Sequence, residues 1–422
     1  MSTKRIPRRN TTTARTHELK EAIVASFANP GNGAVEGLRT FSDADWKSVL
    51  WWLDISGLAI YFLAQSLEMG DGRVLPGWVS EDLAQRFAKN RIRIAALRAE
   101  ACEVAGCLED GGIRYALLKG MTLTPDAVPD SALRSQADLD FLVARQNTSQ
   151  AIHSIQHLGY RLQAVSGDTM EFRAGETIVP EAGNMYSVRT PRALELHLLA
   201  ETDGQSSLLT RRLWRVFDDT PVAVLSPPDI LVQQAKHLVK HLCGEYTRLA
   251  WVLEFWRHVW AKCGDGVYWH AAEQVAAAEK NGDLAMGMAL WAAKEFFGKM
   301  PIEMPRQWSA EALPAPVLLW LKRYARTLLM GDAIGSKLYA LLRREMPRGR
   351  EQERSTREIL FPRYLPAPIM RPRPQERLAE RLERYAVEMD FFFRRLEFHV
   401  VEGVRFGIEA PRWRRAVERC QR

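Results

Sequence analysis

Paired cysteines, long apolar runs and familiar enzyme signatures are all missing from this chain of 422 residues. Its five cysteines are scattered and form no CxxC pair, so the sequence indicates neither a disulfide framework nor a zinc ribbon. The most apolar segment, 49–64, contains Asp54 and is short for a bilayer span. The N-terminus is basic and polar, without the apolar stretch of a secretory signal. We therefore expect a cytoplasmic protein with reduced thiols and no membrane span.

No GxSxG, HExxH or GxxxxGK motif occurs. This argues against an α/β-hydrolase, a zinc protease of the HExxH type and a P-loop NTPase. Basic residues are in slight excess over acidic ones, 58 against 51, which gives a net charge of +7. That surplus suits a phosphate-bearing partner, nucleic acid included, but it equally describes an ordinary basic surface. Nucleic acid is therefore a partner that the charge allows without favouring it.

Composition and periodicity divide the chain into five segments. Residues 1–16 are expected to form a disordered basic tail, and 17–109 a helical region. Mixed strand and helix patterns over 110–225 predict a small α+β core. A second helical domain is expected over 226–345, where the Ser226-Pro227-Pro228-Asp229 start signal is followed by helical periodicity. The remainder, 346–422, is read as a Pro/Arg-rich linker followed by a C-terminal helical tail.

The expected elements follow from alternation and periodicity. Helices are expected over 42–67, with Ser42 or Asp43 as the cap, over 80–108 and over 317–344, and an extended linker over 347–374. The strand candidates are 113–119, 138–143, 160–165 and 193–199, with shorter ones at Glu171-Phe172 and Ile178-Val179.

The most informative feature is Asp138-Leu139-Asp140, which opens the second strand candidate. Side chains two apart in a strand point to the same side, so both carboxylates project together. Like charges held that close repel, and burying either of them unpaired is costly. A cation is therefore expected between them, and a divalent metal is the simplest candidate.

A turn ahead of this strand adds groups that bind anions. Lys119 and Gly120 lie at the end of the first strand candidate, where glycine lets backbone N–H groups approach a phosphate closely. Lys119 adds a point charge and Thr122 a hydroxyl. Arg134, four residues before Asp138, is placed either to reach a phosphate or to brace the acidic pair.

In this order, the motifs resemble those of the uncharacterised bacterial nucleotidyltransferase family within the DNA polymerase β-like superfamily. The resemblance covers about residues 90–258. The motifs that carry it are LLKG at 117–120, Arg134, DLDFLV at 138–143, Leu158-Gly159-Tyr160, Leu194-Glu195-Leu196-His197, Leu225-Ser226-Pro227-Pro228-Asp229, and a stretch with His237, His241, Trp251 and Glu254. The first turn departs from the superfamily, whose members carry Gly-Ser or Gly-Gly there, whereas the resembled branch reads LKG.

The resemblance implies a polymerase β-like core, a small mixed sheet with flanking helices, that binds NTP. It also implies three carboxylates on two Mg²⁺ ions, with Mn²⁺ as the alternative metal. Asp138 and Asp140 match the first two carboxylates, and Glu195 is the expected third, because 193–199 is a strand candidate beside them. Lys119, Gly120, Thr122 and Arg134 are then the expected triphosphate-binding residues.

Four further side chains are candidate substrate contacts. His197 shares a face with Glu195 by strand alternation. His237 and His241 share one face of a helix, beside a basic stripe that includes Lys240. The two helix histidines are read either as contacts to substrate phosphate or as ordinary core residues.

The sequence thus predicts a Mg²⁺-dependent nucleotidyltransferase that moves an NMP group to a hydroxyl- or phosphate-bearing acceptor. Small molecules, peptides, proteins and polysaccharide precursors all remain open as acceptors. One alternative is a catalytically silent nucleotide- or nucleic-acid-binding module. The other is a sugar-nucleotide glycosyltransferase that uses the DxD motif, although no long βαβ half precedes it.

Overall fold

The computed structural model describes residues 14–69, 74–175, 185–187, 192–200, 208–301, 303, 305–333, 335–347, 356–360 and 376–420. Most of the expected basic tail and the strand candidate at Ile178-Val179 lie outside these residues. The first helix begins at Ala14, two residues before the predicted end of the tail.

A seven-stranded mixed sheet forms the centre of the fold, in the order β3-β4-β5-β2-β1-β7-β6. β2 pairs in parallel with β5 and antiparallel with β1, and β1 pairs in parallel with β7. The strands are β1 Tyr115–Leu118, β2 Leu139–Ala144, β3 Arg161–Ser166, β4 Thr169–Ala174, β5 Arg192–Leu199, β6 Leu213–Phe217 and β7 Thr220–Val224.

The four long strand candidates are confirmed, and Glu171-Phe172 belongs to β4. The β6–β7 hairpin was missed. Its turn residues Asp218 and Asp219 have φ of 45° and 66°. Such a turn is normally signalled by Asn-Gly or Asp-Gly, so two aspartates give little warning of it.

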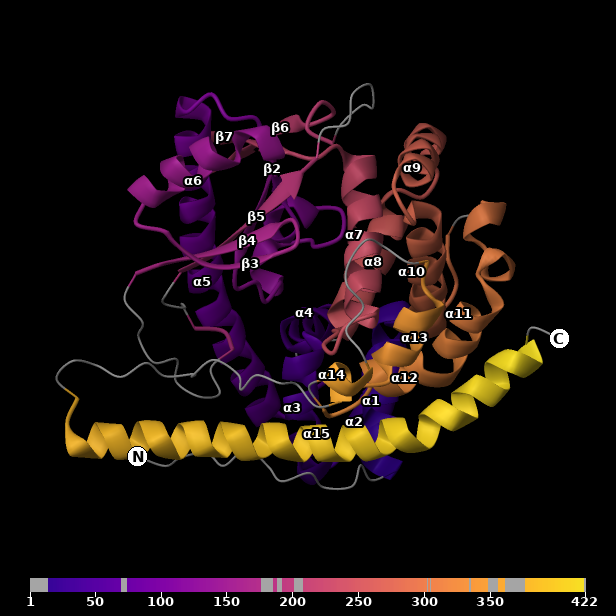
Figure 1. Ribbon diagram of the computed structural model, residues 1–422. Helices are drawn as coiled ribbons and strands as arrows, with labels where there is room; N and C mark the ends of the chain where they lie inside the picture. The colour runs from indigo at the N-terminus through magenta and orange to yellow at the C-terminus, as the bar shows by residue number, and fades with distance from the viewer. Residues whose placement is uncertain are drawn as a thin grey trace.

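Along the chain, helices come both before and after the strands of the sheet. Before and within it lie α1 Ala14–Ala28, α2 Asn32–Arg39, α3 Asp43–Ser56, α4 Ala59–Met69, α5 Gly77–Asp110 and α6 Thr148–His157. After it come α7 Pro227–Leu242, α8 Leu249–Ala261, α9 Gly266–Ala278, α10 Gly282–Phe297, α11 Ala315–Trp320, α12 Arg326–Leu329, α13 Tyr339–Glu345, α14 Thr356–Leu360 and α15 Leu378–Cys420. The predicted α+β class, with a mixed sheet between two helical regions, is confirmed (Figure 1).

Short 3₁₀ turns at Gly120–Leu123, Ser131–Leu133, Arg145–Asn147, Arg306–Trp308 and Ala310–Ala312 complete the connections.

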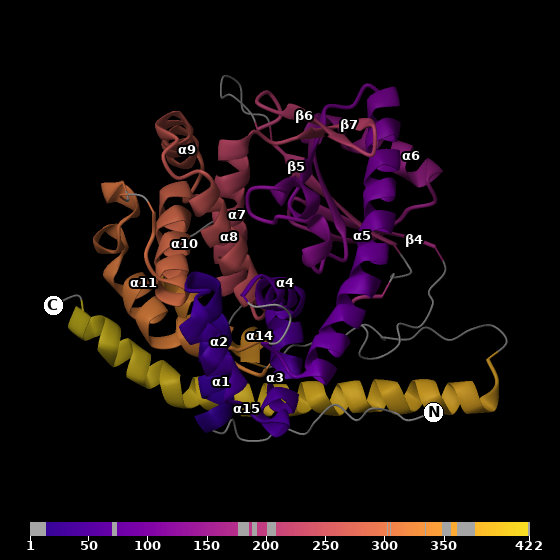
Figure 2. The same cartoon turned by 180° about the vertical axis from the view of Figure 1, so that it is seen from behind.

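The strand period of two separates two cores across the sheet. Leu139, Phe141 and Val143 of β2 pack with α5 and α6, whereas Leu142 and Ala144 join the larger core of the other helices. α5 crosses behind the sheet in Figure 1 and in front of it in Figure 2, so it covers one face. In both views α7 and α8 stand between the sheet and helices α9, α10 and α11. The even-numbered residues of β2, including Asp140, therefore face α7 and α8.

The prediction of a single helix over 42–67 is wrong, because the segment forms two helices, α3 and α4. Ser42 forms the expected cap, as a capping box with Asp45, but the helix ends at Gly57. Gly57 adopts φ of 76°, which favours glycine and turns the chain. α3 and α4 consequently meet at 117°. No single helix in the described ranges is long and apolar enough to cross a membrane, and α3 and α4 meet that criterion only as this bent pair.

The C-terminal expectations also need correction. The helix predicted over 317–344 is divided into α11, a π-helical turn at Leu321–Ala325, α12 and α13. The segment expected to be extended contains α14 among its described residues, while most of it lies outside them. The tail is one helix, α15, which continues through Pro411.

Candidate active site

Two neighbouring parallel strands place the predicted carboxylates side by side. β2 and β5 pair with Asp140 opposite Glu195 and Leu142 opposite His197. Leu194 and Leu196 enter the core under α5, so Glu195 and His197 project from the opposite face. This is also the face from which Asp140 projects. Strand alternation alone predicts which side chains of each strand share a face. The register between β2 and β5 then places Asp140 beside Glu195.

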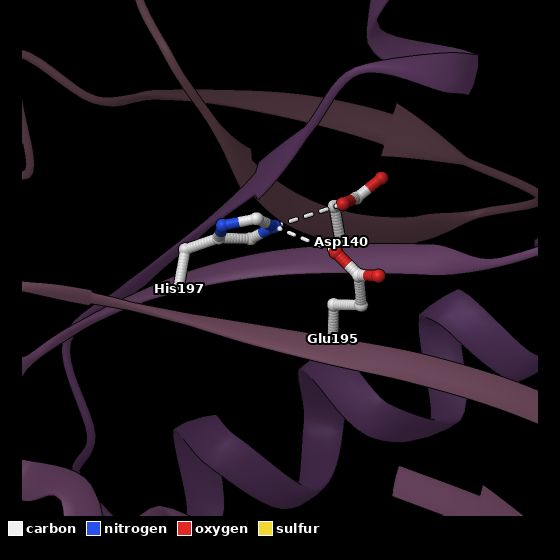
Figure 3. Close-up of side chains that lie close together, drawn as sticks. All are labelled: Asp140, Glu195 and His197. Atoms are coloured by element: carbon white, nitrogen blue, oxygen red, sulfur yellow. Dashed lines mark hydrogen bonds and ion pairs between the residues drawn. The ribbon is translucent and has the colours of Figure 1, made fainter. Parts of the chain in front are cut away.

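Asp140 is the centre of this group and is only 3% exposed. Its Oδ1 accepts a hydrogen bond from Lys119 Nζ at 2.7 Å and lies 2.9 Å from His197 Nε2. The same His197 nitrogen lies 3.4 Å from Glu195 Oε2. Figure 3 shows Asp140, Glu195 and His197 pointing toward one another from the sheet. Lys119 and His197, which are 78 positions apart in the sequence, thus both contact the carboxylate of Asp140.

Charge compensation in this group is internal. Burial alone would raise the pKa of Asp140, but the Lys119 ammonium and the hydrogen bond from His197 outweigh it and lower the pKa. Burial would likewise lower the pKa of His197, but its hydrogen bonds to Asp140 and Glu195 raise it. The hydrogen bond from His197 lowers the pKa of Glu195. The cation expected beside Asp140 is therefore already supplied, in this structure, by Lys119 and assisted by His197.

Asp138 differs from Asp140 in its surroundings. It lies just before β2, and its backbone carbonyl accepts a hydrogen bond from Gln136 Nε2 at 2.7 Å. Burial, and then the charge of Asp140, raise the pKa of the Asp138 carboxyl. The two aspartates of the DxD motif are thus not equivalent: one is ion-paired, while the other is held closer to its neutral form.

The Lys119-Gly120 turn is tightly constrained. Lys119 and Gly120 both adopt positive φ, 50° and 47°. A Cβ on Gly120 would lie 2.0 Å from Gln136 Oε1, so only glycine fits beside that side chain. The Thr122 hydroxyl donates to the Lys119 carbonyl at 2.9 Å and so closes the turn. Gly120 and Thr122 therefore shape the turn, and their predicted contact with phosphate remains a proposal.

Arg134 does not brace the acidic pair. Its Nε lies 3.2 Å from both carboxylate oxygens of Glu254 on α8. Glu254 is buried and also accepts a hydrogen bond from the Tyr61 hydroxyl at 2.9 Å. This link spans 120 positions in sequence, so spacing alone did not reveal it; the predicted contact of Arg134 with phosphate stays a prediction.

A cavity of about 320 Å³ lies between this face of the sheet and helices α7 and α8. It is lined by Leu118, Lys119, Thr122, Leu123, Arg134, Leu142, His197, Leu208, Leu225, Ile230, Gln233, Gln234, Lys236, His237, Lys240, Trp251 and Glu254. Six of the predicted site residues are among them, and Lys119 and His197 join the cavity to the carboxylate group. Cationic side chains line the cavity from the end of β1 (Lys119) and from α7 (Lys236 and Lys240), among apolar and aromatic ones.

The α7 histidines are neutral and pack on an aromatic ring. His237 and His241 lie 4.4 Å apart, and their rings are 4.9 Å and 4.2 Å from that of Trp251. Burial lowers the pKa of His237 well below its usual value and lowers that of His241 to about 4. His237 lines the cavity, whereas His241 Nδ1 contacts the Tyr246 carbonyl at 3.0 Å. Only the first of the two is therefore placed to touch a ligand in the cavity.

Several residues of the site were not anticipated. Gln136, Gln233 and Gln234 carried no recognisable signal, because an isolated glutamine matches no motif. Glu254 was quoted with the family motifs but given no partner. Its presence within an apolar helix, opposite a buried arginine, is the signal that could have paired it.

The described residues contain one group whose ligand atoms could hold a metal ion. It consists of Asp140, Glu195 and His197, with atoms within 4.8 Å of one another. Two carboxylates and an imidazole are suitable ligands for a divalent ion. Asp138 is outside this group in the observed arrangement, and Lys119 competes for Asp140. The donor set fits one ion, provided that Lys119 turns away.

The model of a family described as "Uncharacterised nucleotidyltransferase" matches residues 42–298, well over half of the chain. The solved structures that are similar include an antigenic nucleotidyltransferase-like protein from Paracoccidioides brasiliensis. It is 15% identical, with 48% of this chain and 97% of that chain covered and a TM-score of 0.29. No curated protein matches this chain.

Proposed function

Because this chain belongs to the uncharacterised nucleotidyltransferase family, we propose that it transfers an NMP group from NTP to a hydroxyl- or phosphate-bearing acceptor. The observation that carries the proposal is the convergence of Asp140, Glu195 and His197 beside a cavity whose lining includes several cationic side chains. Carboxylates beside a cationic pocket are the combination that phosphoryl transfer needs.

The metal site is proposed to consist of Asp140 and Glu195, with His197 as a neutral ligand or as their hydrogen-bond partner. Asp138 completes the carboxylate set when its side chain turns toward Asp140. A bound divalent ion would neutralise charge on the transferred phosphoryl group and lower the pKa of the attacking hydroxyl. Two Mg²⁺ ions are proposed, with Mn²⁺ as the alternative.

The protein's own cations then bind the triphosphate. Lys119 has an ammonium group within reach of both Asp140 and the cavity, so it can pass from the carboxylate to a phosphate oxygen. Arg134 and Lys240 line the same cavity. The apolar part of the wall, which includes Trp251 and the neutral His237, suits the nucleoside better than the phosphates.

The decisive experiment compares nucleotide binding and turnover in two isosteric variants. Asp140→Asn and Glu195→Gln keep the shape of the site and remove one charge each. We expect Mg²⁺-dependent release of pyrophosphate from NTP, measured with a panel of hydroxyl and phosphate acceptors, to fall by about 100-fold or more in both. Asp218→Asn, on the β6–β7 turn where it pairs with Arg98 and does not line the cavity, is the matched control and should retain full activity. Unchanged turnover in Asp140→Asn contradicts the proposal.

A second candidate is a nucleotide-binding module without catalysis, and the Lys119–Asp140 ion pair favours it. A carboxylate already neutralised from within does not require a metal. Calorimetry separates the two functions, because the module would bind NTP equally well with and without Mg²⁺ and would release no pyrophosphate. The glycosyltransferase alternative has less support, since β1 and β2 form an antiparallel pair rather than a βαβ unit.

A further inference from the structure

Helix α15 carries an apolar stripe that the rest of the described structure leaves exposed. The spacing along this stripe is 4-3-4-3-4, the repeat of a coiled-coil seam. Its members are Leu378, Leu382, Tyr385, Met389, Phe392 and Leu396. Their exposed fractions run from 39% for Phe392 to 71% for Leu378. An exposed apolar surface of this length marks an interaction site.

The stripe is not the side by which α15 attaches to its own chain. The buried residues of α15 are Arg384, Glu402, Phe406, Ala410 and Trp413. On a helical projection at about 100° per residue, Arg384, Glu402, Phe406 and Trp413 lie about 80–120° from the centre of the stripe, and Ala410 lies beyond its C-terminal end. Figures 1 and 2 both show α15 lying along the base of the molecule, outside the packed helices. One side of the helix is thus covered by the chain, and an adjacent side is free to accept a partner.

We propose that this stripe pairs with the same stripe of a second copy of the chain, as a parallel, in-register coiled coil. A heptad period favours a second helix over a flat surface, because only a supercoiled helix keeps the a and d positions in contact. The heptad is also widened by apolar residues at the e positions, Ala379, Ala386, Phe393 and Val400. A broad seam on a single helix is complementary to an identical seam.

Charge excludes the main rival surfaces. Residues 376–400 contain six acidic and five basic side chains, so this segment is close to neutral. Helices that lie on anionic membranes, and those that bind nucleic acid, need a cationic polar face. Mixed charges of near-zero sum instead suit a partner that carries the same mixture.

The charges beside the seam also select the orientation. In a parallel pair, the charged g positions Arg381, Glu388 and Arg395 face apolar e positions of the other copy. An antiparallel pair with the same overlap would bring Glu388 near its own counterpart and Arg381 near the arginine equivalent to Arg395. Like charges at such positions are destabilising. The parallel register avoids both contacts.

The test is the mass of the full chain in solution. We expect sedimentation equilibrium at micromolar concentration to give twice the mass of one chain. Met389→Glu and Leu382→Glu should weaken dimerisation by at least roughly 100-fold, because each places paired charges in an apolar seam. Val267→Glu, which changes a strongly exposed apolar side chain on α9, is the matched control and should leave the dimer intact. Far-UV circular dichroism checks that each variant remains folded.

The orientation is tested by a disulfide in a chain whose exposed Cys263 and Cys420 are replaced by serine. Met389→Cys should then crosslink to its counterpart on oxidation, whereas Glu383→Cys, on the outer side of the helix, should not. A monomeric wild-type chain, or flotation of a monomeric chain with anionic vesicles that Met389→Glu abolishes, overturns the proposal. A stable dimer that Met389→Glu leaves unchanged, or one that Met389→Cys fails to crosslink, overturns it as well.

Discussion

A carboxylate as deeply buried as Asp140 needs a compensating charge, and this chain supplies one from its own Lys119. The need for a cation could be predicted from the DxD spacing, because strand geometry fixes where both carboxylates point. The ion pair with Lys119 could not. Lys119 reaches Asp140 only through a turn whose two positive φ angles no sequence pattern specifies. The ion pair of Arg134 with Glu254 escaped prediction for a related reason, since Glu254 lies on a helix far along the chain.

Gly120→Ala should destabilise the protein, because the added Cβ meets Gln136 and the residue also has positive φ. Gly159→Ala is the matched control: its φ is 84°, but nothing lies within 4 Å of the added Cβ. We expect the loss at Gly120 to exceed that at Gly159 by about 1–3 kcal/mol in urea unfolding. Equal losses would mean that backbone strain alone, and not the contact with Gln136, selects glycine here.

Glu100 gives the clearest pH dependence. Burial raises its pKa to about 7 beside the Tyr160 hydroxyl, from a usual value of 4.5. Between these two values the unfolded chain loses a proton that the folded chain keeps, so stability falls as pH rises, by at most about 1.4 kcal/mol per pH unit. Glu100→Gln should remove this slope, as measured by urea unfolding from pH 4.5 to 8. If the free energies of unfolding of Glu100→Gln and of the wild type changed in parallel with pH, the assignment to Glu100 would be contradicted. Glu103→Gln, which changes an exposed neighbour, is the control and should show the same pH dependence as the wild type.

At the scale of elements, local signals predicted what helices and strands do on their own. Ser42 caps α3 and Ser226 caps α7, as their sequences indicate. The bend at Gly57 was missed because the residues on both sides of it are apolar and helical in pattern. The breaks after α11 and the continuity of α15 through Pro411 depend on packing between distant segments, which periodicity does not report.

Ser226→Ala should loosen the start of α7, the helix that contributes the most residues to the cavity. The Ser226 hydroxyl accepts a hydrogen bond from the Asp229 amide at 3.4 Å and also bonds the Asp229 side chain. We expect a loss of about 0.5–2 kcal/mol in the free energy of unfolding. Ser226→Thr retains the hydroxyl and should recover most of it. A variant with alanine that is as stable as the wild type would show that the two prolines and Asp229 suffice to start the helix.

At the scale of the whole molecule, the helices before and after the sheet share a single core. Leu19 and Ile23 of α1 belong to the same cluster as Trp320 and Leu341, about 300 positions later. Lys20, itself buried, reinforces this connection through an ion pair with Asp332. The N-terminal and C-terminal helical regions are therefore separate in sequence but share one hydrophobic core. The pattern of either segment alone could not predict this packing.

A fragment limited to residues 42–298, the range matched by the family, should consequently be less stable than the full chain. It lacks α1, α11 and α13, which cover part of the shared core. We expect it to bind a hydrophobic fluorescent dye and to unfold at a lower urea concentration. A fragment that unfolds cooperatively at the midpoint of the full chain, without dye binding, would show that the family range is an independent folding unit.

The shared use of Lys119 has a thermodynamic consequence. One ammonium group cannot neutralise Asp140 and a triphosphate at the same time. In the proposed reaction, nucleotide binding draws Lys119 from Asp140 and so uncovers the carboxylate for the ion, while an ion on Asp140 releases Lys119 for the nucleotide. Each ligand thereby raises the affinity for the other by the same factor, since such coupling is reciprocal. If both ligands bind as proposed, Lys119 would disfavour binding of either ligand alone and would give positive cooperativity when both are present.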